Sequence, residues 1–385
     1  MQRILILTMM ISMTSQLEMC GSTEKKPAVE WKEGPSLPPA AGDAVAVGLA
    51  GALSGMHNGH LVVAGGANFP EGMPWEGGKK AFHADYYVYA KRGDGFVLHK
   101  KGMLPAALAY GASCSTPGGI IYAGGETGDG LSRDVWLVKW DKVDDSLLTS
   151  KLPQLPEPLA NAAISCAGSR VYLAGGETAT SVSGKLLMLD LDNPAAGWKQ
   201  EAPLPYEVSH AVAGMVRENG RLCFFVAGGR KRNPGNTSTF YQSLSSYDPV
   251  KGLWSKKSDM PEALAAGCGT VINERYLLLF GGDQGNTFAK TEKLIIAITK
   301  ETDSARREAL TNEKNRLQST HPGFSRRVKI YDAVTGQWSC ADTLEFPTPV
   351  TTTAVQTGNQ VIIPGGEIRA GVRTPTIYLG TINEK

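Results

Sequence analysis

The chain has 385 residues, including 45 glycines and 22 prolines, and a formal net charge of +2. A chain of this length could hold two or three domains, but one repeat runs through nearly all of it, which favours a single domain. Charges of both signs are interspersed and no basic stripe is present, so the composition argues against binding to nucleic acid.

The first residues differ in character from the rest of the chain. Arg3 precedes an apolar stretch at 4–13, which is too short to span a bilayer but is typical of a signal peptide. The segment around Cys20 resembles a bacterial lipoprotein signal. We therefore expect residues 1–20 to direct export and residues 21–28 to be a linker. The expected location is periplasmic or membrane-anchored, with Cys20 as the lipid attachment point in the anchored case.

Six Gly-Gly doublets divide the chain at intervals of 59, 51, 53, 53 and 84 residues. Each doublet closes a short apolar run, as at 61–64 and 224–227, of the kind that forms a buried strand. Paired glycines allow a sharp turn where strands crowd a central axis. A period near 50 residues with this signature is typical of the kelch β-propeller. The doublets are Gly65-Gly66, Gly124-Gly125, Gly175-Gly176, Gly228-Gly229, Gly281-Gly282 and Gly365-Gly366.

A second motif marks the outer part of the repeat. Tyr-Asp followed by Gly and Trp occurs at 247–254 and 331–338, and a looser copy occupies 190–198. The Asp and Gly suit a turn between the third and fourth strands, and the Trp is expected to pack between blades.

The interval of 84 residues contains an insertion in the fifth repeat. The spacing from doublet to Trp is 31 residues longer there than in the fourth repeat. Part of the extra segment, 301–318, is charged and lacks Gly and Pro, so we expect a solvated helical insertion near 299–320.

The two ends of the chain complete the last repeat. Only one strand, at 374–382, follows the last doublet, and the segment 31–38 has the character of the missing outer strand. Pairing the two leaves no exposed sheet edge. The predicted fold is therefore all-β: a six-bladed kelch β-propeller over residues 29–385, closed by pairing the N-terminal strand with the C-terminal blade.

The segments after the doublets should meet at one mouth of the central channel, which is the default site. There Glu367 is followed six residues later by Arg373, across a Gly-containing turn. An acid and a guanidinium on adjacent strand ends could grip an anionic substrate and move a proton beside it. Because Glu follows the doublet in three of the six repeats, inheritance of the repeat alone, or a structural Glu–Arg pair, explains the same pattern.

The segment 365–374 resembles the catalytic loop of the kelch-type sialic acid mutarotases, the N-acetylneuraminate epimerases. The segments 50–69, 109–127 and 286–288, the Lys79-Lys80 pair and the long fifth-repeat insertion are also similar to that family. In the better-known branch the Glu/Arg loop lies mid-chain, whereas here it is C-terminal. The chain thus resembles a cyclically permuted branch, which a closed ring tolerates because only the cut point moves.

The resemblance implies an isomerase that interconverts the α and β anomers of N-acetylneuraminate, a small anionic sugar, with neither a metal nor another cofactor. Glu367 matches the family's proton acceptor and Arg373 its essential arginine, while Leu108 replaces an arginine of the family pattern. The expected substrate-binding residues are the family matches Phe69, Tyr110 and Glu126 together with the post-doublet residues Asn68, Glu177 and Arg230.

Three other functions fit a kelch-type or six-bladed propeller. The strongest alternative is a non-catalytic module that binds a glycan or a protein. A sialidase would carry repeated Ser-x-Asp-x-Gly-x-x-Trp boxes, which the sequence lacks. A copper oxidase would need a Tyr/Cys/His ligand set that cannot be assembled at the mouth.

Overall fold

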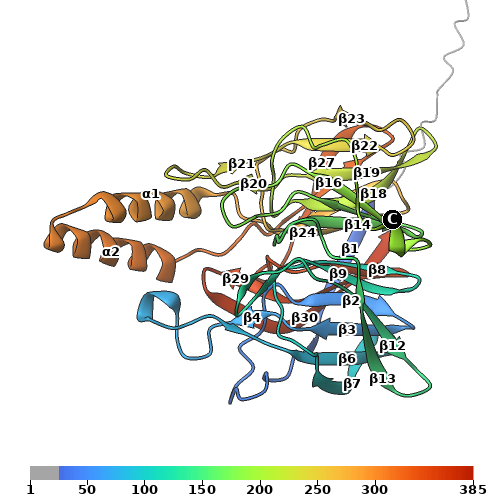
Figure 1. The fold of residues 1–385 in the computed structure, drawn as a ribbon, viewed down its shortest axis with the longest axis horizontal. Helices are drawn as coiled ribbons and strands as arrows, with labels where there is room; N and C mark the ends of the chain where they lie inside the picture. Colours follow the sequence, from blue (N-terminus) through green and yellow to red (C-terminus); the bar gives the residue numbers. More distant parts are fainter. Residues whose placement is uncertain (1–25, 385) are drawn as a thin grey trace, which may run out of the picture.

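The computed structural model describes residues 26–384, and in it six four-stranded antiparallel sheets form a β-propeller (Figure 1). The predicted all-β, six-bladed fold is confirmed. The predicted signal peptide, with Cys20, lies outside the described residues, as does most of the predicted linker. The first strand begins at Pro27, so the linker ends before the predicted residue 28.

Five blades run in chain order from the axis to the rim, and the closing blade does so except that its rim strand is the N-terminal β1. The first three blades consist of β2 (Leu53–His57), β3 (His60–Ala64), β6 (Asp85–Arg92) and β7 (Gly95–Met103); β8 (Ala112–Thr116), β9 (Gly119–Ala123), β12 (Val135–Asp141) and β13 (Ser146–Leu152); and β14 (Ala163–Ala167), β15 (Arg170–Ala174), β16 (Leu186–Asp190) and β17 (Lys199–Gln200).

The next two blades and the closing blade follow the same order. They consist of β18 (Val212–Glu218), β19 (Arg221–Ala227), β22 (Leu244–Asp248) and β23 (Leu253–Lys256); β24 (Cys268–Ile272), β25 (Tyr276–Phe280), β26 (Arg327–Asp332) and β27 (Gln337–Thr343); and β28 (Val355–Thr357), β29 (Gln360–Arg369), β30 (Val372–Glu384) and β1 (Pro27–Ser36).

Short ribbons and single helical turns occupy several of the connections. They are β4 (Ala67–Asn68) with β5 (Ala81–Phe82), β10 (Glu126–Thr127) with β11 (Gly130–Leu131), β20 (Arg230–Lys231) with β21 (Thr239–Phe240), and the 3-10 turns η1 (Pro74–Glu76) and η2 (Pro194–Ala196).

The apolar runs before the doublets form the second strand of every blade, as predicted. These strands are buried because neighbouring blades cover both faces of each sheet; all five residues of β9 and of β25 are buried. The outer-strand motif also behaves as expected. The indole N–H of Trp254 donates to the carbonyl of Ala202 in the preceding blade over 2.9 Å, and that of Trp338 donates to Ser258 in the same way.

The doublets join neighbouring blades through their backbone. Both glycines of every doublet have positive φ, a conformation that glycine adopts without strain. The N–H of Gly66 donates to the carbonyl of Leu108 in the next blade over 2.7 Å, and Gly125 donates to Leu159 over 2.8 Å. A Cβ on Gly65 would lie 2.4 Å from the carbonyl oxygen of Leu108 in the next blade, so a larger residue would force the blades apart.

A closed ring of backbone hydrogen bonds surrounds the axis at the same end. Six residues, one per blade, each donate an N–H to the carbonyl of the equivalent residue in an adjacent blade, over 2.7 to 2.9 Å. All six have positive φ, between 49° and 66°. We call them the axial ring; its members are Gly51, Tyr110, Asn161, His210, Ala266 and Thr351.

The N-terminal strand closes the propeller as predicted. β1 pairs antiparallel with β30, with Pro27 opposite Glu384 and Trp31 opposite Gly380. The indole of Trp31 then meets the fifth blade, where its ring centroid lies 5.3 Å from that of Phe280 and 5.6 Å from that of Phe346.

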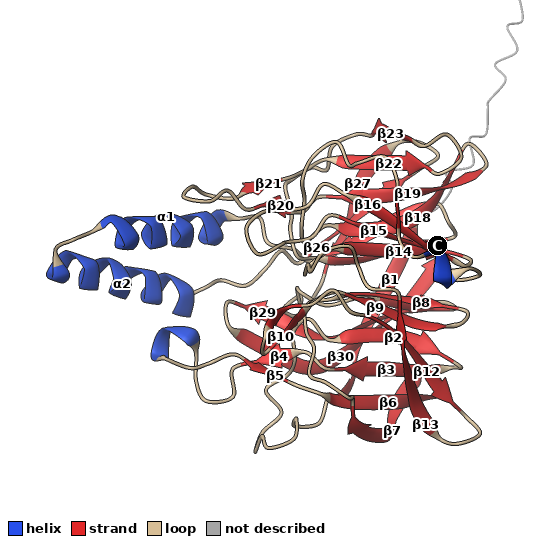
Figure 2. Cartoon of the chain, in the orientation of Figure 1, coloured by secondary structure: helices blue, strands red, loops and turns tan. Residues whose placement is uncertain are grey.

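The insertion contains two helices, α1 (Asn286–Lys300) and α2 (Ser304–Ser319), which project from one side of the strand-rich body (Figure 2). α2 lies in the segment 299–320, for which the sequence predicts a helix, and the carboxylate of Asp303 caps it by accepting from the N–H of Arg306. α1 was not predicted, because it begins without a side-chain cap and contains several β-branched residues. In residues 26–384, neither helix combines the length and apolar character needed to cross a membrane.

Replacing Trp31 with Ala should lower the free energy of unfolding by about 3 kcal/mol, because the indole links the closing strand to the neighbouring blade. Equilibrium urea denaturation would measure the change. Val143→Ala, at a turn where the side chain is 92% exposed, is the control and should stay within about 0.5 kcal/mol of the wild type. A W31A midpoint equal to that of the wild type would show that Trp31 does not stabilise the closure.

Candidate functional site

A cavity of about 480 Å³ opens at the mouth that carries the post-doublet segments. Its walls come from these segments, the axial ring, η1 and the two inserted helices. Five residues predicted from the sequence line it: Phe69, Tyr110, Arg230, Glu367 and Arg373. The mouth therefore gathers side chains from the first, second, fourth and last blades.

Glu367 and Arg373 face each other across the hairpin that joins β29 to β30. They are register partners, and a carboxylate oxygen of Glu367 lies 3.1 Å from Nη2 of Arg373. The other carboxylate oxygen accepts the N–H of Gly371 at 3.2 Å, where the turn requires positive φ. The six-residue spacing in the sequence thus produces an ion pair inside the cavity.

The contacts that hold the guanidinium of Arg373 use its Nη2 atom and one of its faces. Its side chain is 5% exposed, its guanidinium lies 4.6 Å from the ring centroid of Phe69, and Nη2 also approaches the hydroxyl of Tyr110 at 3.5 Å. Within residues 26–384, Nε and Nη1 are buried without a hydrogen-bond partner. Buried donors without acceptors are costly, so this guanidinium is suited to an anionic ligand that supplies them.

Burial raises the pKa of Glu367 above its ordinary 4.5. Arg373 and the N–H of Gly371 oppose the increase, while the charge of Asp283 adds to it. A carboxyl group whose pKa moves towards neutrality can exchange a proton with a bound substrate under physiological conditions.

Tyr110 belongs to the axial ring, and its left-handed backbone holds the side chain at the cavity. The ammonium of Lys80 lies 4.9 Å from the centroid of the Tyr110 ring and 2.5 Å from a carboxylate oxygen of Glu126. Glu126 itself does not line the cavity. It therefore acts on the site through Lys80, and the structure does not place it where the sequence predicted a substrate-binding residue.

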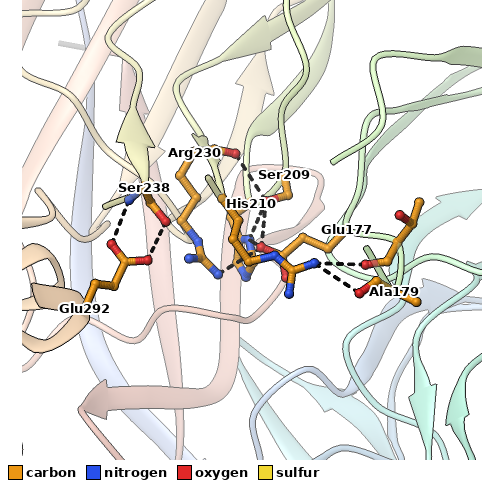
Figure 3. Close-up of polar contacts among 9 residues, drawn as sticks. Glu177, Ala179, Ser209, His210, Arg230, Ser238 and Glu292 are labelled. Carbon is orange, nitrogen blue, oxygen red and sulfur yellow. Dashed lines mark hydrogen bonds and ion pairs between the residues drawn. The ribbon is translucent and has the colours of Figure 1, made fainter. Parts of the chain in front are cut away.

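Glu177 and Arg230 form a second ion pair (Figure 3). Nη2 of Arg230 lies 3.0 Å from Oε1 of Glu177, which also accepts the hydroxyl of Ser209 at 3.2 Å. Burial keeps the pKa of His210 well below its ordinary value, so its 3.8 Å contact with Glu177 involves a neutral imidazole. Arg230 lines the cavity and stacks on Phe288, whereas Glu177 lies behind it and holds it in place.

Asn68 is also outside the cavity wall. It is 2% exposed, its amide oxygen lies 2.7 Å from Nε2 of His83, and its amide nitrogen lies 3.4 Å from Asp43. All of its polar atoms are used within the protein. The predicted binding role of Asn68, like those of Glu126 and Glu177, therefore becomes one of support for neighbouring residues.

The sequence analysis missed the part of the site that the insertion builds. Trp75, Phe288, Glu292 and His321 line the cavity. The carboxylate of Glu292 accepts the N–H and the hydroxyl of Ser238, both at 2.7 Å, which fixes α1 to the β20–β21 ribbon (Figure 3). Phe288 lies in the segment 286–288 that resembles the family, but no motif in the sequence marks the other three, because they reach the mouth from long connections rather than from the repeat.

Asp283 was also missed, although a signal was present. It directly follows the fifth doublet, just as Glu367 follows the sixth, and it lines the cavity. Over the part of the chain that the structure describes, no three His, Cys, Asp or Glu side chains gather in a group that could hold a metal ion.

The model of the N-acetylneuraminate epimerase family matches residues 13–147 and 152–385. The chain belongs to this family. An N-acetylneuraminate epimerase of Brucella melitensis is 38% identical over 120 residues, which cover 30% of this chain and 31% of the relative. One of Salmonella typhi is 27% identical over 234 residues, covering 59% and 57%. The alignments thus span about a third and somewhat over half of these family members.

The solved structure of YjhT has a similar fold. The TM-score is 0.60 at 14% sequence identity, and the match covers 91% of this chain and 99% of the other. At this identity the likeness supports the propeller architecture alone.

Replacing Asp283 with Asn should stabilise the protein at alkaline pH above the folded-state pKa of Asp283, because there the wild type holds a buried carboxylate. Burial raises the pKa of Asp283 above 3.8. The stability that its protonated form contributes is present below that value and is lost as the pH rises through the folded-state pKa. The difference between D283N and the wild type, measured by urea denaturation over a pH series, should shrink as the pH falls through the folded-state pKa of Asp283 and be absent below about 4.

Asp134→Asn provides a control of opposite sign. A hydrogen bond from Lys151 lowers the pKa of Asp134, so this carboxylate stabilises the fold above its ordinary pKa and the contribution is lost in acid. D134N should therefore be slightly less stable than the wild type at neutral pH. A D283N variant that is less stable than the wild type at alkaline pH above the folded-state pKa of Asp283 would contradict the burial argument.

Proposed function

We propose that the protein is a mutarotase that interconverts the α and β anomers of N-acetylneuraminate by opening and reclosing the sugar ring. The observation that carries the proposal is the buried guanidinium of Arg373, with two donors that have no acceptor among residues 26–384, beside a carboxyl group of raised pKa. Membership of the N-acetylneuraminate epimerase family and the names of the relatives support the same substrate.

Arg373 is suited to the sugar's carboxylate. Within residues 26–384 its Nε and Nη1 have no acceptor, and N–H donors of a guanidinium suit the oxygens of a carboxylate. Phe69 on the face of the guanidinium and Glu367 at Nη2 fix its orientation before the substrate arrives. A preorganised fork loses little conformational entropy on binding.

Glu367 is then the base for the anomeric hydroxyl. Removing the hydroxyl proton turns the anomeric oxygen into a carbonyl oxygen as the bond from the anomeric carbon to the ring oxygen breaks. The ring oxygen gains a proton, rotation exposes the other face of the carbonyl, and reclosure gives the other anomer. Each step is a proton transfer or a rotation, which acid–base groups at about hydrogen-bonding distance accelerate.

A binding module without turnover is the alternative function, and the same charges would serve it. The raised pKa of Glu367 favours catalysis, because a carboxylate needed only to accept hydrogen bonds in binding gains nothing from a raised pKa.

We also propose that the enzyme acts after export, in the periplasm or tethered to a membrane through Cys20. The basic residue Arg3 and the apolar stretch 4–13 support this proposal. The mass of the mature N-terminus would test it, since cleavage before Cys20 with added lipid identifies the anchored form.

Replacing Glu367 with Gln should abolish accelerated anomer exchange while the fold remains intact, because the amide cannot take the anomeric proton. The rate at which a freshly dissolved single anomer of N-acetylneuraminate equilibrates, followed by proton NMR, measures the effect, and a loss of about 10²-fold or more is expected. Glu345→Gln, at an exposed position outside the cavity, should exchange at the wild-type rate. An E367Q variant as fast as the wild type would remove Glu367 from the mechanism.

Replacing Arg373 with Lys should weaken sugar binding about 10- to 100-fold, because the charge remains but the fork is lost. Titration calorimetry with N-acetylneuraminate would give the affinity. Arg369→Lys is the matched control, since Arg369 lies in the same hairpin but is exposed and does not line the cavity. Equal affinities for R373K and the wild type would mean that the carboxylate binds elsewhere.

A further inference from the structure

Asp283 occupies the same place in the fifth blade as Glu367 in the last blade. Asp283 exchanges two backbone hydrogen bonds with Ala265, at 2.8 and 2.9 Å, and Glu367 exchanges the equivalent two with Val350 at the same distances. Both acids directly follow a doublet and both line the cavity. The propeller symmetry therefore presents two carboxyl groups to one ligand from adjacent blades.

The surroundings of the two carboxyl groups differ. Glu367 has the guanidinium of Arg373 at 3.1 Å, whereas Asp283 has no cation within ion-pair distance in residues 26–384. One oxygen of Asp283 accepts the N–H of Gly285 at 2.8 Å. Its pKa is raised chiefly by burial, which the charges of His321 and Arg230 only partly offset.

His321 does not supply a counter-charge at neutral pH. Burial lowers the pKa of its imidazole, and Nδ1 accepts the N–H of Gly323 at 3.0 Å, so Nε2 carries the proton of the neutral ring. Arg230 is engaged by Glu177 at 3.0 Å. Among the described residues, Asp283 therefore lacks the close counter-charge that Glu367 has in Arg373.

The two acids also influence one another. The charge of Asp283 raises the pKa of Glu367, which means that a negative charge on both is unfavourable. Only Glu367 has a guanidinium at 3.1 Å, so the geometry favours the single charge on Glu367 beside a protonated Asp283. The two carboxyl groups can therefore serve as base and acid because their surroundings differ.

We propose that Asp283 is the general acid that gives a proton to the ring oxygen while Glu367 takes the proton of the anomeric hydroxyl. This inference rests on the proposed mutarotase function. It adds a catalytic residue, contributed by the fifth blade, to the Glu367–Arg373 pair of the last blade.

The proton count balances over one turnover. On opening, the anomeric O–H bond breaks and its proton moves to Glu367, the bond between the anomeric carbon and the ring oxygen breaks, and the ring oxygen takes the proton of Asp283. On reclosure, Asp283 recovers that proton from the hydroxyl that attacks the carbonyl, and Glu367 returns its proton to the carbonyl oxygen. The enzyme regains its starting protonation state without a co-reactant.

The test compares wild type, D283N, D283E and E367Q by the NMR exchange assay, with kcat and KM determined over a pH series. D283N should lower kcat about 10²- to 10³-fold at unchanged KM, because the amide has no carboxylic proton to give. The alkaline fall in the wild-type kcat, which reports loss of the acid's proton, should be absent from the residual rate of D283N. D283E should recover part of kcat, and D134N, outside the cavity, should equal the wild type.

The outcomes separate this inference from the proposed function. A wild type that does not accelerate exchange would overturn both. Acceleration that is lost in E367Q but kept in D283N would overturn the role of Asp283 and leave the mutarotase function standing. A D283N variant with raised KM and unchanged kcat would make Asp283 a binding residue and would also overturn the proposal. D283N is expected to fold, and D283E tests the same role through a variant that keeps the carboxyl group.

Discussion

The axial ring is the constraint on which the rest of the structure depends. Six N–H groups and six carbonyls satisfy one another in a closed circle, so the circle fixes both the number of blades and their mutual angle. Its five non-glycine members adopt left-handed backbone conformations that cost about 1 to 3 kcal/mol each, and the ring geometry holds them there. Because Tyr110, His210 and Thr351 belong to the ring, the same conformations bring side chains to the cavity.

The mouth contains ionisable side chains whose burial is energetically unfavourable. Two acids with raised pKa values and a guanidinium with unsatisfied donors lie within one cavity. Arrangements of this kind reduce stability and are retained where a ligand or a reaction uses them. The supporting residues limit the cost: Glu177 holds Arg230, Glu126 holds Lys80, and the hairpin N–H of Gly371 binds Glu367.

The insertion extends the site above the propeller body. α1 and α2 project on the side of the ribbons β4 and β20 (Figure 1). The side-chain amide of Asn315 in α2 approaches the carbonyl of Trp75 in η1 at 3.4 Å, which connects the insertion to the first blade. Trp75, Phe288 and Glu292 of the wall come from these segments, whereas Asp283 and the Glu367–Arg373 pair come from the repeat. Blade loops and insertion therefore both contribute to one cavity.

The sequence by itself determined the blade count, the closure by β1 and the Glu367–Arg373 pair, because each depends on periodicity or on a short spacing that survives without coordinates. It placed Phe69 and Arg230 at the mouth through the same periodicity, whereas Tyr110 came from the resemblance to the family. Only the tertiary structure decided that Asn68, Glu126 and Glu177 stand behind the cavity wall and that Asp283 stands in it. Equivalent positions of a repeat look alike in sequence. Whether such a residue lines the cavity depends on the direction of its side chain and on the charges near it, and long-range packing sets both.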